Sequence, residues 1–254
     1  MKSNNISLRF NNCLQAIFII IITLFVFSLT AIDAHASVTY GPNTYASGFG
    51  FNFTGNTVLN TNGTTATGGV RLVSDKAITW DAPLIECELY WYQSSWELVA
   101  YRSLQPAIGS GKVWVGETPS IYGPSMAVLV QGEVLCYNET YTQRVQFWPA
   151  QLQGGILALA SPLSTIVPLP NNGCYEINEK GDTYGSGVYA RQLGYYPDLI
   201  AVRGDNGKSG FIYYFELEEI NDYALRNDIP PDSMKQLLVY KDNGIDIIDT
   251  FTIS

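Results

Sequence analysis

Two glutamates, Glu86 and Glu88, have the residue type and spacing that most directly suggest chemistry in this sequence. They lie two residues apart in Leu84–Tyr92, a segment in which apolar and polar residues alternate. Residues i and i+2 of a β-strand share one face, so the two side chains would stand roughly 6 to 7 Å apart. Two carboxylates in a cleft lined by aromatic rings can hydrolyse a glycosidic bond. A carbohydrate-active hydrolase that uses this pair is therefore one hypothesis.

The same segment also has a purely structural interpretation. Alternation is the ordinary pattern of a strand with one face on the core and one face in solvent. The residues expected to face the core are Ile85, Cys87, Leu89 and Trp91. Those expected to face solvent are Glu86, Glu88, Tyr90 and Tyr92. In this interpretation both glutamates are solvated, and replacing either by Gln leaves the stability nearly unchanged.

Four aromatic residues near the glutamates are candidate ligand-binding residues: Tyr90, Trp91, Tyr92 and Trp96. Tyr and Trp at a surface offer large rigid rings with a polar tip, on which sugars or partner proteins can stack. Aromatic residues are also good strand formers that fill cores. Both uses stay open at these positions.

The single histidine among the 254 residues, His35, limits the chemistry further. It lies in residues 1–36, where an apolar run over Ala16–Ala31 precedes Ala34-His35-Ala36, a pattern typical of a secretory signal peptide. Cleavage after Ala36 would leave no histidine, which excludes Ser-His-Asp triads, Cys-His dyads and His-ligated zinc. No other apolar run approaches 18 residues, so we expect a secreted protein, extracellular or in the cell-wall zone, without a transmembrane segment after cleavage.

The charge balance narrows the choice of partners. The chain has 14 Lys and Arg residues against 23 Asp and Glu residues, a formal net charge of −9. A nucleic-acid binder needs basic residues to neutralise phosphates, so nucleic acid is not an expected partner. A cell-wall or extracellular glycan, or a protein, is the expected kind of partner, and its identity is unknown.

Three cysteines follow the signal peptide: Cys87, Cys136 and Cys174. Disulfides persist outside the cell, so one bridge could form and leave one thiol over. Cys87 and Cys136 lie in apolar alternating runs and could bridge neighbouring strands, whereas Cys174 could fasten the preceding linker. All three could equally be small buried hydrophobic residues.

Asp242 and Asp246 flank an Asn243-Gly244 turn and are candidate calcium ligands, because calcium prefers carboxylate and carbonyl oxygens. The turn does not follow the spaced pattern of a calcium-binding loop, and Asn-Gly alone is a strong hairpin signal. We therefore expect no metal and no cofactor.

The pattern along the chain predicts a mainly β protein. Residues 37–148 alternate with period two and indicate an antiparallel sandwich or Greek-key barrel. Residues 149–173 are uncharged and Pro-rich and indicate an ordered linker, and residues 174–254 indicate a small β-rich unit with one short helix over Ile220–Asn227. The other expected strands are Tyr45–Phe53, Gly69–Thr79, Trp96–Leu104, Lys112–Val115, Ser125–Tyr137 and Tyr141–Trp148, followed by the hairpins Leu199–Val202 with Ser209–Tyr214 and Leu237–Tyr240 with Ile245–Ile253.

The C-terminal residues carry a motif in three pieces. Tyr175–Gly185 reads YEINEKGDTYG, Pro197–Ile200 reads PDLI, and Gly204–Phe211 reads GDNGKSGF. These pieces resemble a C-terminal segment of uncharacterised secreted proteins of Gram-positive bacteria, with the pattern N-E-N-G-x-T-Y-G, P-D-L-I and G-x-x-G-x-x-G-Y. Lys180 and Phe211 depart from it. The resemblance implies an accessory extracytoplasmic unit joined to varied N-terminal parts, and it transfers no catalytic residue.

Three hypotheses of function follow. The first is a secreted, non-enzymatic binding or surface-interaction protein whose N-terminal β domain recognises the ligand. The second is the carbohydrate-active hydrolase that uses Glu86 and Glu88. The third is a secreted toxin, bacteriocin-like factor or inhibitor, which secretion permits but no residue supports. The first two differ in where the glutamates must lie, since a hydrolase needs them in an accessible cleft.

Overall fold

The computed structural model of the chain describes residues 37–80, 83–104, 111–122, 127–140, 142–155, 169, 173–227 and 235–253. The predicted signal peptide and most of the predicted linker lie outside these residues. Within them the chain is mostly β, with two sheets and short helices, which confirms the predicted fold class. No helix in these ranges is long and apolar enough to cross a membrane.

The first sheet is antiparallel and has the strand order β1-β3-β4-β7, with β2 also paired to β3 and β8 also paired to β4. The strands are β1 (Ser37–Tyr40), β2 (Thr44–Gly48), β3 (Phe51–Thr61), β4 (Thr65–Ile78), β7 (Gly111–Glu117) and β8 (Ile121–Tyr122).

The second sheet has the order β10-β9-β5-β6-β14-β15-β16-β17, with β11 on β9 and the β12–β13 hairpin on β14. Its strands are β5 (Pro83–Tyr92), β6 (Trp96–Leu104), β9 (Ala127–Tyr137), β10 (Arg144–Phe147), β11 (Leu152–Gly155), β12 (Glu176–Ile177), β13 (Thr183–Gly185), β14 (Leu199–Arg203), β15 (Ser209–Tyr213), β16 (Lys235–Tyr240) and β17 (Ile247–Ile253). The residues of the predicted N-terminal domain and C-terminal unit share this sheet, because β6 and β14 pair in parallel at Leu98 and Val202.

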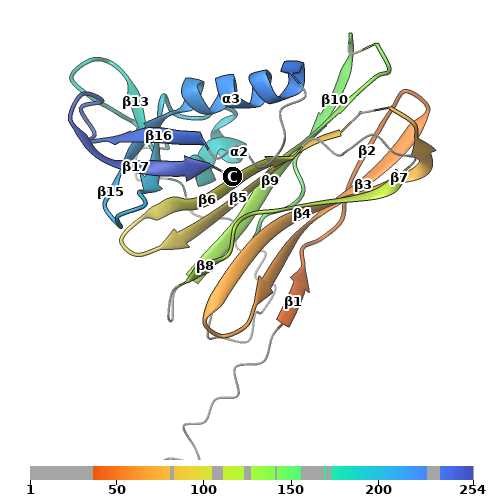
Figure 1. Cartoon of the computed structure of the whole chain (residues 1–254), viewed down its shortest axis with the longest axis horizontal. Coiled ribbons are helices and arrows are strands. Elements are labelled where there is room, and N and C mark those ends of the chain that lie inside the picture. The colour runs from red at the N-terminus through yellow and green to blue at the C-terminus, as the bar shows by residue number, and fades with distance from the viewer. Residues whose placement is uncertain are drawn as a thin grey trace, which may run out of the picture. The chain divides into compact units, whose positions relative to one another are not determined.

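The two sheets pack face to face as a sandwich. Figure 1 shows β5, β6 and β9 between the strands of the first sheet and the blue C-terminal elements. Apolar side chains from the two sheets meet in the interior, since β3 and β4 contribute Phe53 and Leu72 while β5 and β9 contribute Ile85 and Val134. Burying these side chains is the main stabilising contribution to this layer.

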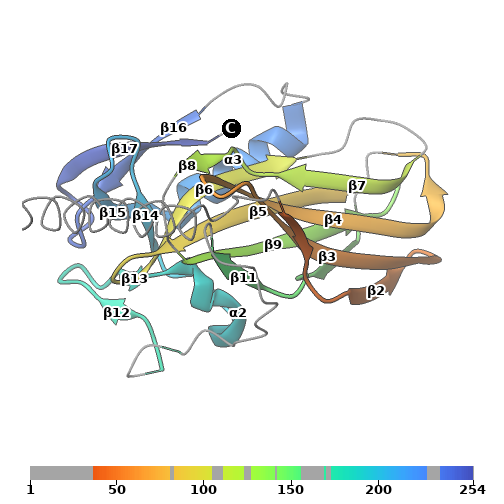
Figure 2. The same cartoon turned by 90° about the horizontal axis from the view of Figure 1, so that it is seen from below.

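Short helical segments lie on the other face of the second sheet. They are η1 (Gly187–Tyr189), α2 (Ala190–Leu193) and α3 (Tyr214–Asn227). The Ser186 side chain caps η1, and α2 ends at Gly194, whose φ of 85° is in the left-handed region that glycine tolerates. In Figure 2, α2 lies beside β9 and β11. The helix predicted over Ile220–Asn227 begins earlier, at Tyr214, directly after β15.

A second cluster of buried residues fills the space between these helices and the second sheet. It joins Tyr90 of β5 and Tyr101 of β6 to Val188 of η1, Leu217 of α3 and Phe251 of β17. Both faces of β5 are therefore covered, one by the first sheet and one by C-terminal residues.

Several strand predictions are confirmed by the observed pairing. Both C-terminal hairpins form, as β14 with β15 and β16 with β17, and β10 returns on β9 after the turn at Asn138. The prediction of a single strand over Tyr45–Phe53 is wrong, because Phe49 and Gly50 have positive φ values and turn the chain between β2 and β3. Residues 152–155 of the predicted linker form β11.

Candidate functional site

A buried hydrogen-bond network surrounds Glu88, the second candidate catalytic glutamate. Glu88 is 3% exposed. Its Oε2 accepts hydrogen bonds from the Tyr90 hydroxyl and from Gln131 Nε2, both at 2.6 Å. Its Oε1 accepts a hydrogen bond from the Tyr196 hydroxyl at 2.9 Å. Three donors to one carboxylate offset much of the free energy needed to bury it, and they leave neither oxygen open to a substrate.

Glu86 lies beside this network with a third carboxylate, Glu133. The two residues are directly opposite each other in the pairing of β5 with β9. Glu133 is buried and accepts a hydrogen bond from Gln146 Nε2, whereas Glu86 is half-buried and is hydrogen-bonded to Tyr101. The predicted division of β5 into two faces is right, but the prediction that the glutamate face is solvated is wrong.

Burial raises the pKa of all three carboxyl groups, and repulsion from neighbouring carboxylates adds to the shift for Glu86 and Glu133. For Glu86, burial is the largest cause and the nearby Glu133 and Glu88 add to it, so its pKa is well above the ordinary value. Burial also raises the pKa of Glu88, although the three donors oppose the shift. Burial raises the pKa of Glu133 to about 6, with the Gln146 bond opposing the change. The cluster therefore holds protons at pH values where exposed glutamates have lost them.

Hydrogen bonds to β9 and to the segment between β10 and β11 hold η1 and α2 over the glutamates. Gln131 Nε2 donates to the carbonyl of Gly187 at 3.2 Å, and Gln151 Nε2 donates to the carbonyl of Val188 at 3.0 Å. In the reverse direction, the Arg191 side chain of α2 donates to the carbonyl oxygens of Pro149 and Trp148. The cover over this face is thus held by directed bonds as well as by apolar packing.

The four aromatic candidates near the glutamates have different environments. Tyr90 and Trp96 are buried in the cluster between the second sheet and its helices. Trp91 is half-buried, and the Arg203 guanidinium lies 5.3 Å from its ring centroid. Tyr92, at 46% exposed, is the one of the four that solvent reaches freely, and its ring packs 5.3 Å from that of Trp96. They do not form one exposed platform.

The three cysteines are all free thiols, so the bridge considered between Cys87 and Cys136 is absent. The two lie on paired strands and both face the sandwich core, but Cys87 is opposite Gly132. That offset of four residues separates them by roughly 13 Å along the strand. A disulfide needs Cα atoms within about 7 Å. Cys174 is exposed, and Cys87 donates instead to the carbonyl of Gly116 at 3.1 Å.

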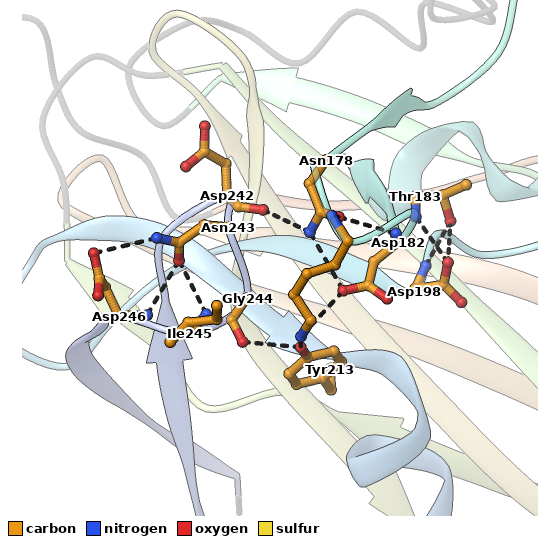
Figure 3. A network of polar contacts seen from close by, with 11 residues as sticks. Asn178, Asp182, Thr183, Asp198, Tyr213, Asp242, Asn243, Gly244, Ile245 and Asp246 are labelled. Atoms are coloured by element: carbon orange, nitrogen blue, oxygen red, sulfur yellow. Dashed lines mark hydrogen bonds and ion pairs between the residues drawn. The ribbon is translucent and has the colours of Figure 1, made fainter.

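The two candidate calcium ligands belong to the turn between β16 and β17, shown in Figure 3. Asn243 Oδ1 accepts from the backbone N–H groups of Ile245 and Asp246, and Asp246 Oδ2 accepts from Lys241 Nζ at 2.9 Å. The backbone carbonyl of Asp242 accepts from Asn178 Nδ2 at 3.0 Å. The described residues contain no group of three or more metal-ligating side chains. These contacts are those of an ordinary hairpin turn.

The motif residues at Tyr175–Gly185 and Pro197–Ile200 have structural partners. Asn178 Oδ1 accepts from the backbone N–H groups of Lys180 and Asp182, which closes the β12–β13 turn. Asp198 Oδ2 accepts from both the backbone N–H and the hydroxyl of Thr183, as Figure 3 shows. These bonds hold the β12–β13 hairpin against β14. The motif residues therefore have a structural role in this part of the fold.

The third piece of the motif, around Gly204, is held by two aspartates. Asp249 is buried and accepts from the backbone and side chain of Asn206 and from the backbone of Lys208. Asp205 accepts from the backbone and hydroxyl of Thr252. A Cβ on Gly204 would lie 2.5 Å from the Asp249 carboxyl, so glycine is needed there for close approach.

Three strongly exposed tyrosines lie on the outer face of the first sheet. Tyr40, Tyr45 and Tyr122 are 56%, 72% and 75% exposed. In the strand pairing Tyr40 is opposite Val58 of β3, and Tyr45 is opposite Thr54, which lies on the same face of β3 as Val58. Tyr122 of β8 is opposite Thr65 of β4. The alternate residues of β3 and β4 fill the core, so all three rings stand on the face that points away from it.

Neutral polar side chains occupy the strands between these rings. We call the set the tyrosine face: Tyr40, Tyr45, Tyr122, Thr54, Asn56, Asn60 and Thr67. Charged residues share this outer face. Arg71 of β4 is directly opposite Asn56, and Glu117 of β7 is opposite Gly69 of β4, beside the exposed Val113 and Val115.

The sequence alone predicted neither the buried network around Glu88 nor the grouping of the three exposed tyrosines on one face. Gln131 and Glu133 stand at i, i+2 in the otherwise apolar run of β9, the same spacing as the two glutamates of β5. Two polar pairs in neighbouring buried strands could have indicated a buried network. Tyr40 and Tyr45 lie in a turn-rich stretch, and only the strand register brings them to one face with Tyr122.

The fold and these sites define the class of molecule as a mostly β protein of two packed sheets with a helical cover on the second. No protein-family model, no curated protein and no solved structure matches the chain.

Proposed function

We propose that this protein is a secreted, non-enzymatic binding protein whose recognition surface is the tyrosine face of the first sheet. The observation that carries the proposal is the presence of three strongly exposed tyrosines on one sheet face. Exposed tyrosines supply rigid contact area at little loss of side-chain entropy, and for this reason they are enriched at binding surfaces.

The buried setting of the glutamates supports this function over the hydrolase. A glycoside hydrolase needs one carboxyl group to reach the glycosidic oxygen and the other to reach the sugar carbon or a water. Both oxygens of Glu88 are already bonded to protein donors, and η1 lies over the network. Catalysis there would require the cover to open and three hydrogen bonds to break.

A binding array of glycans, peptidoglycan fragments and extracellular proteins, probed with the chain from Ser37 onward, tests the proposal. We expect a ligand whose binding is lost in the double variant Tyr45→Ala/Tyr122→Ala. The matched control is Tyr195→Ala, an exposed tyrosine on the loop after α2. A ligand held equally by the double variant would place recognition elsewhere.

Reducing-end release from the same glycans tests the enzymatic alternative. We expect no release above a buffer control. Release that disappears in Glu88→Gln while the variant stays folded would establish the hydrolase and overturn the proposal.

A further inference from the structure

We propose that residues 187–196, which hold η1 and α2, form a pH-operated cover that is closed over Glu88 in acid and opens as the pH rises. We call this segment the Glu88 cover. It goes beyond the proposed function, because the Glu88 cover packs on the second sheet and the tyrosine face belongs to the first. Its support lies in the bonds that join the cover to Glu88, the tight fit beneath η1 and the charges buried there.

Both ends of the Glu88 cover are bonded to one network. At one end, Gln131 Nε2 donates both to Glu88 Oε2 at 2.6 Å and to the carbonyl of Gly187 at 3.2 Å. At the other end, the Tyr196 hydroxyl donates to Glu88 Oε1 at 2.9 Å. A movement of the cover away from the sheet therefore breaks bonds of this network and admits water to the carboxyl group.

The closed cover leaves no free space beneath η1. A Cβ built on Gly187 would lie 2.5 Å from the Tyr90 hydroxyl and 3.3 Å from the Tyr196 ring. Glu88 itself is buried. Hydration of the Glu88 carboxyl group and opening of the cover are therefore coupled.

The bonds around Glu88 suit its neutral form as well as its charged form. The three donors, Tyr90, Gln131 and Tyr196, are all uncharged. A hydroxyl can donate or accept, so Tyr196 can keep its bond when Glu88 Oε1 carries the proton. Burial is costly for the charged form and much less so for the neutral one. The charged form is therefore the one that gains from opening.

The groups that face this site are mainly acids and tyrosines. The titratable and charged side chains around Glu88 and its neighbours are Glu86 of β5, Tyr101 of β6, Glu133 of β9, Arg144 of β10, Tyr175 before β12, Tyr189 of η1, Arg191 of α2, and Tyr214 and Glu218 of α3. Burial raises the pKa of Tyr90, Tyr175 and Tyr196, so these hydroxyls stay neutral at pH 8. Among the described residues that face the site, only carboxyl groups change charge between pH 5 and pH 8.

The direction of the response follows from which state holds the proton more tightly. Burial raises the pKa of Glu88 in the closed state above the ordinary value of 4.5, whereas water restores it toward that value in the open state. Closure is therefore fully favoured below pH 4.5 and weakens as the pH rises through the raised value. The charge of Glu88 also raises the pKa of Glu86 and Glu133, so further ionisation in the cluster acts in the same direction.

Hydrogen exchange followed by mass spectrometry, on the chain from Ser37 onward at pH 5 and pH 8, tests the proposal. After correction for intrinsic exchange, the opening constant of the Glu88 cover should rise by about fivefold or more between the two pH values. At pH 8 it should exceed that of β3 and β4 by about tenfold or more and should not respond to dilute urea, because the opening is local. An unchanged constant, or exchange of the cover in step with β3 and β4, would overturn the proposal.

Two variants separate the acid from the fit of the cover. Glu88→Gln keeps an acceptor oxygen but cannot ionise, so the cover should lose most of its pH dependence. Gly187→Ala places a methyl group against the Tyr90 hydroxyl and should raise the opening constant at both pH values. The matched control is Glu139→Gln, at an exposed turn position, which should behave as the unaltered chain does.

Each variant has a result that contradicts the proposal. Full pH dependence in Glu88→Gln would show that another group drives the opening. If that variant does not fold, Gly187→Ala decides the matter, since an opening constant equal to that of the unaltered chain would show that residues 187–196 do not act as a cover.

Discussion

The carboxylates at the centre of the second sheet and those in the C-terminal turns are similar groups in opposite environments. Burial dominates at the centre and raises the pKa of Glu86, Glu88 and Glu133. In the turns the pKa of Asp249 is lowered, because bonds from Thr250, Asn206 and Lys208 outweigh the contrary effect of burial. Bonds from Lys241 and Asn243 lower the pKa of Asp246 in the same way.

The difference shows what decides the charge state of an acidic residue in this fold. Glu88 accepts three hydrogen bonds from side chains, but burial outweighs them and its pKa is still raised. Asp249 accepts bonds mainly from backbone N–H groups, and these bonds outweigh the effect of its burial. The number of donors alone does not set the direction of the pKa shift; the depth of burial also does.

The largest loss of stability is expected on removing the Glu88 carboxyl, which is the acceptor for three buried hydrogen-bond donors. Glu88→Ala leaves the hydroxyls of Tyr90 and Tyr196 and the amide of Gln131 without it, and should lower the free energy of unfolding by about 3 kcal/mol. Glu88→Gln keeps an acceptor oxygen and should lose about half as much. Urea unfolding followed by tryptophan fluorescence measures both. A loss below about 0.5 kcal/mol in Glu88→Ala would mean that the network contributes little.

The second prediction concerns the dependence of stability on pH. A raised pKa in the folded state means that the folded protein binds the proton more tightly, so stability falls as pH rises between the two values. For Glu133 the interval runs from 4.5 to about 6, which corresponds to about 2 kcal/mol. Thermal unfolding should therefore show higher stability at pH 5 than at pH 7.5.

Glu133→Gln should flatten that profile, because it removes the titrating group while keeping an acceptor for Gln146. The matched control is Glu139→Gln, at an exposed turn position, which should keep the profile of the unaltered chain. Equal slopes in all three proteins would contradict the assignment of the pH dependence to the buried cluster.

The turn carboxylates should show the reverse sign and a smaller effect. A lowered folded pKa contributes stability above the ordinary value of 3.8 that is lost as pH falls below it. Asp249→Asn should lower the Tm by a few degrees at pH 7, and the difference should shrink at pH 3. Asp246→Asn, in an exposed turn, should change the Tm less. A constant difference at both pH values would show that the charge of Asp249 is unimportant.

The thiols provide the smallest and simplest test of the same contrast between interior and surface. Burial raises the pKa of Cys87 and of Cys136, the latter to about 12, so neither should react with a thiol reagent in the native state. Cys174 is exposed and should react at once. The expected count for the chain from Ser37 onward is one fast thiol in buffer and three in denaturant. A count of one in denaturant would reveal a disulfide.

Local patterns in the sequence predicted part of this architecture. The two faces of Leu84–Tyr92 follow from the period of a strand, and the hairpins follow from Asn-Gly turns, which need only neighbouring residues. The turn at Phe49-Gly50 was missed, because glycine and phenylalanine alternate there as they do in strands. Local patterns cannot show that residues near Gly187 and Tyr196 cover the glutamates, since these residues come from a distant part of the chain.

The candidate site was harder to predict for the same reason. Glu86 and Glu88 were recognised as a pair, but their solvent exposure depended on elements far away in sequence. The tyrosine face depends on the register of four strand pairings, and no local rule fixes which residues those pairings bring to one side.

The parallel pairing of β6 with β14 has a consequence for the order in which this chain can fold. Leu98 of β6 belongs to the same interior cluster as Phe251 and Ile253 of β17, which lie far from it in the sequence. That interior cannot close until β17 has been synthesised. Contacts between such distant segments slow folding, since a long loop must be ordered before they form. A chain shortened before β17 should therefore populate an open intermediate that chaperones and proteases recognise.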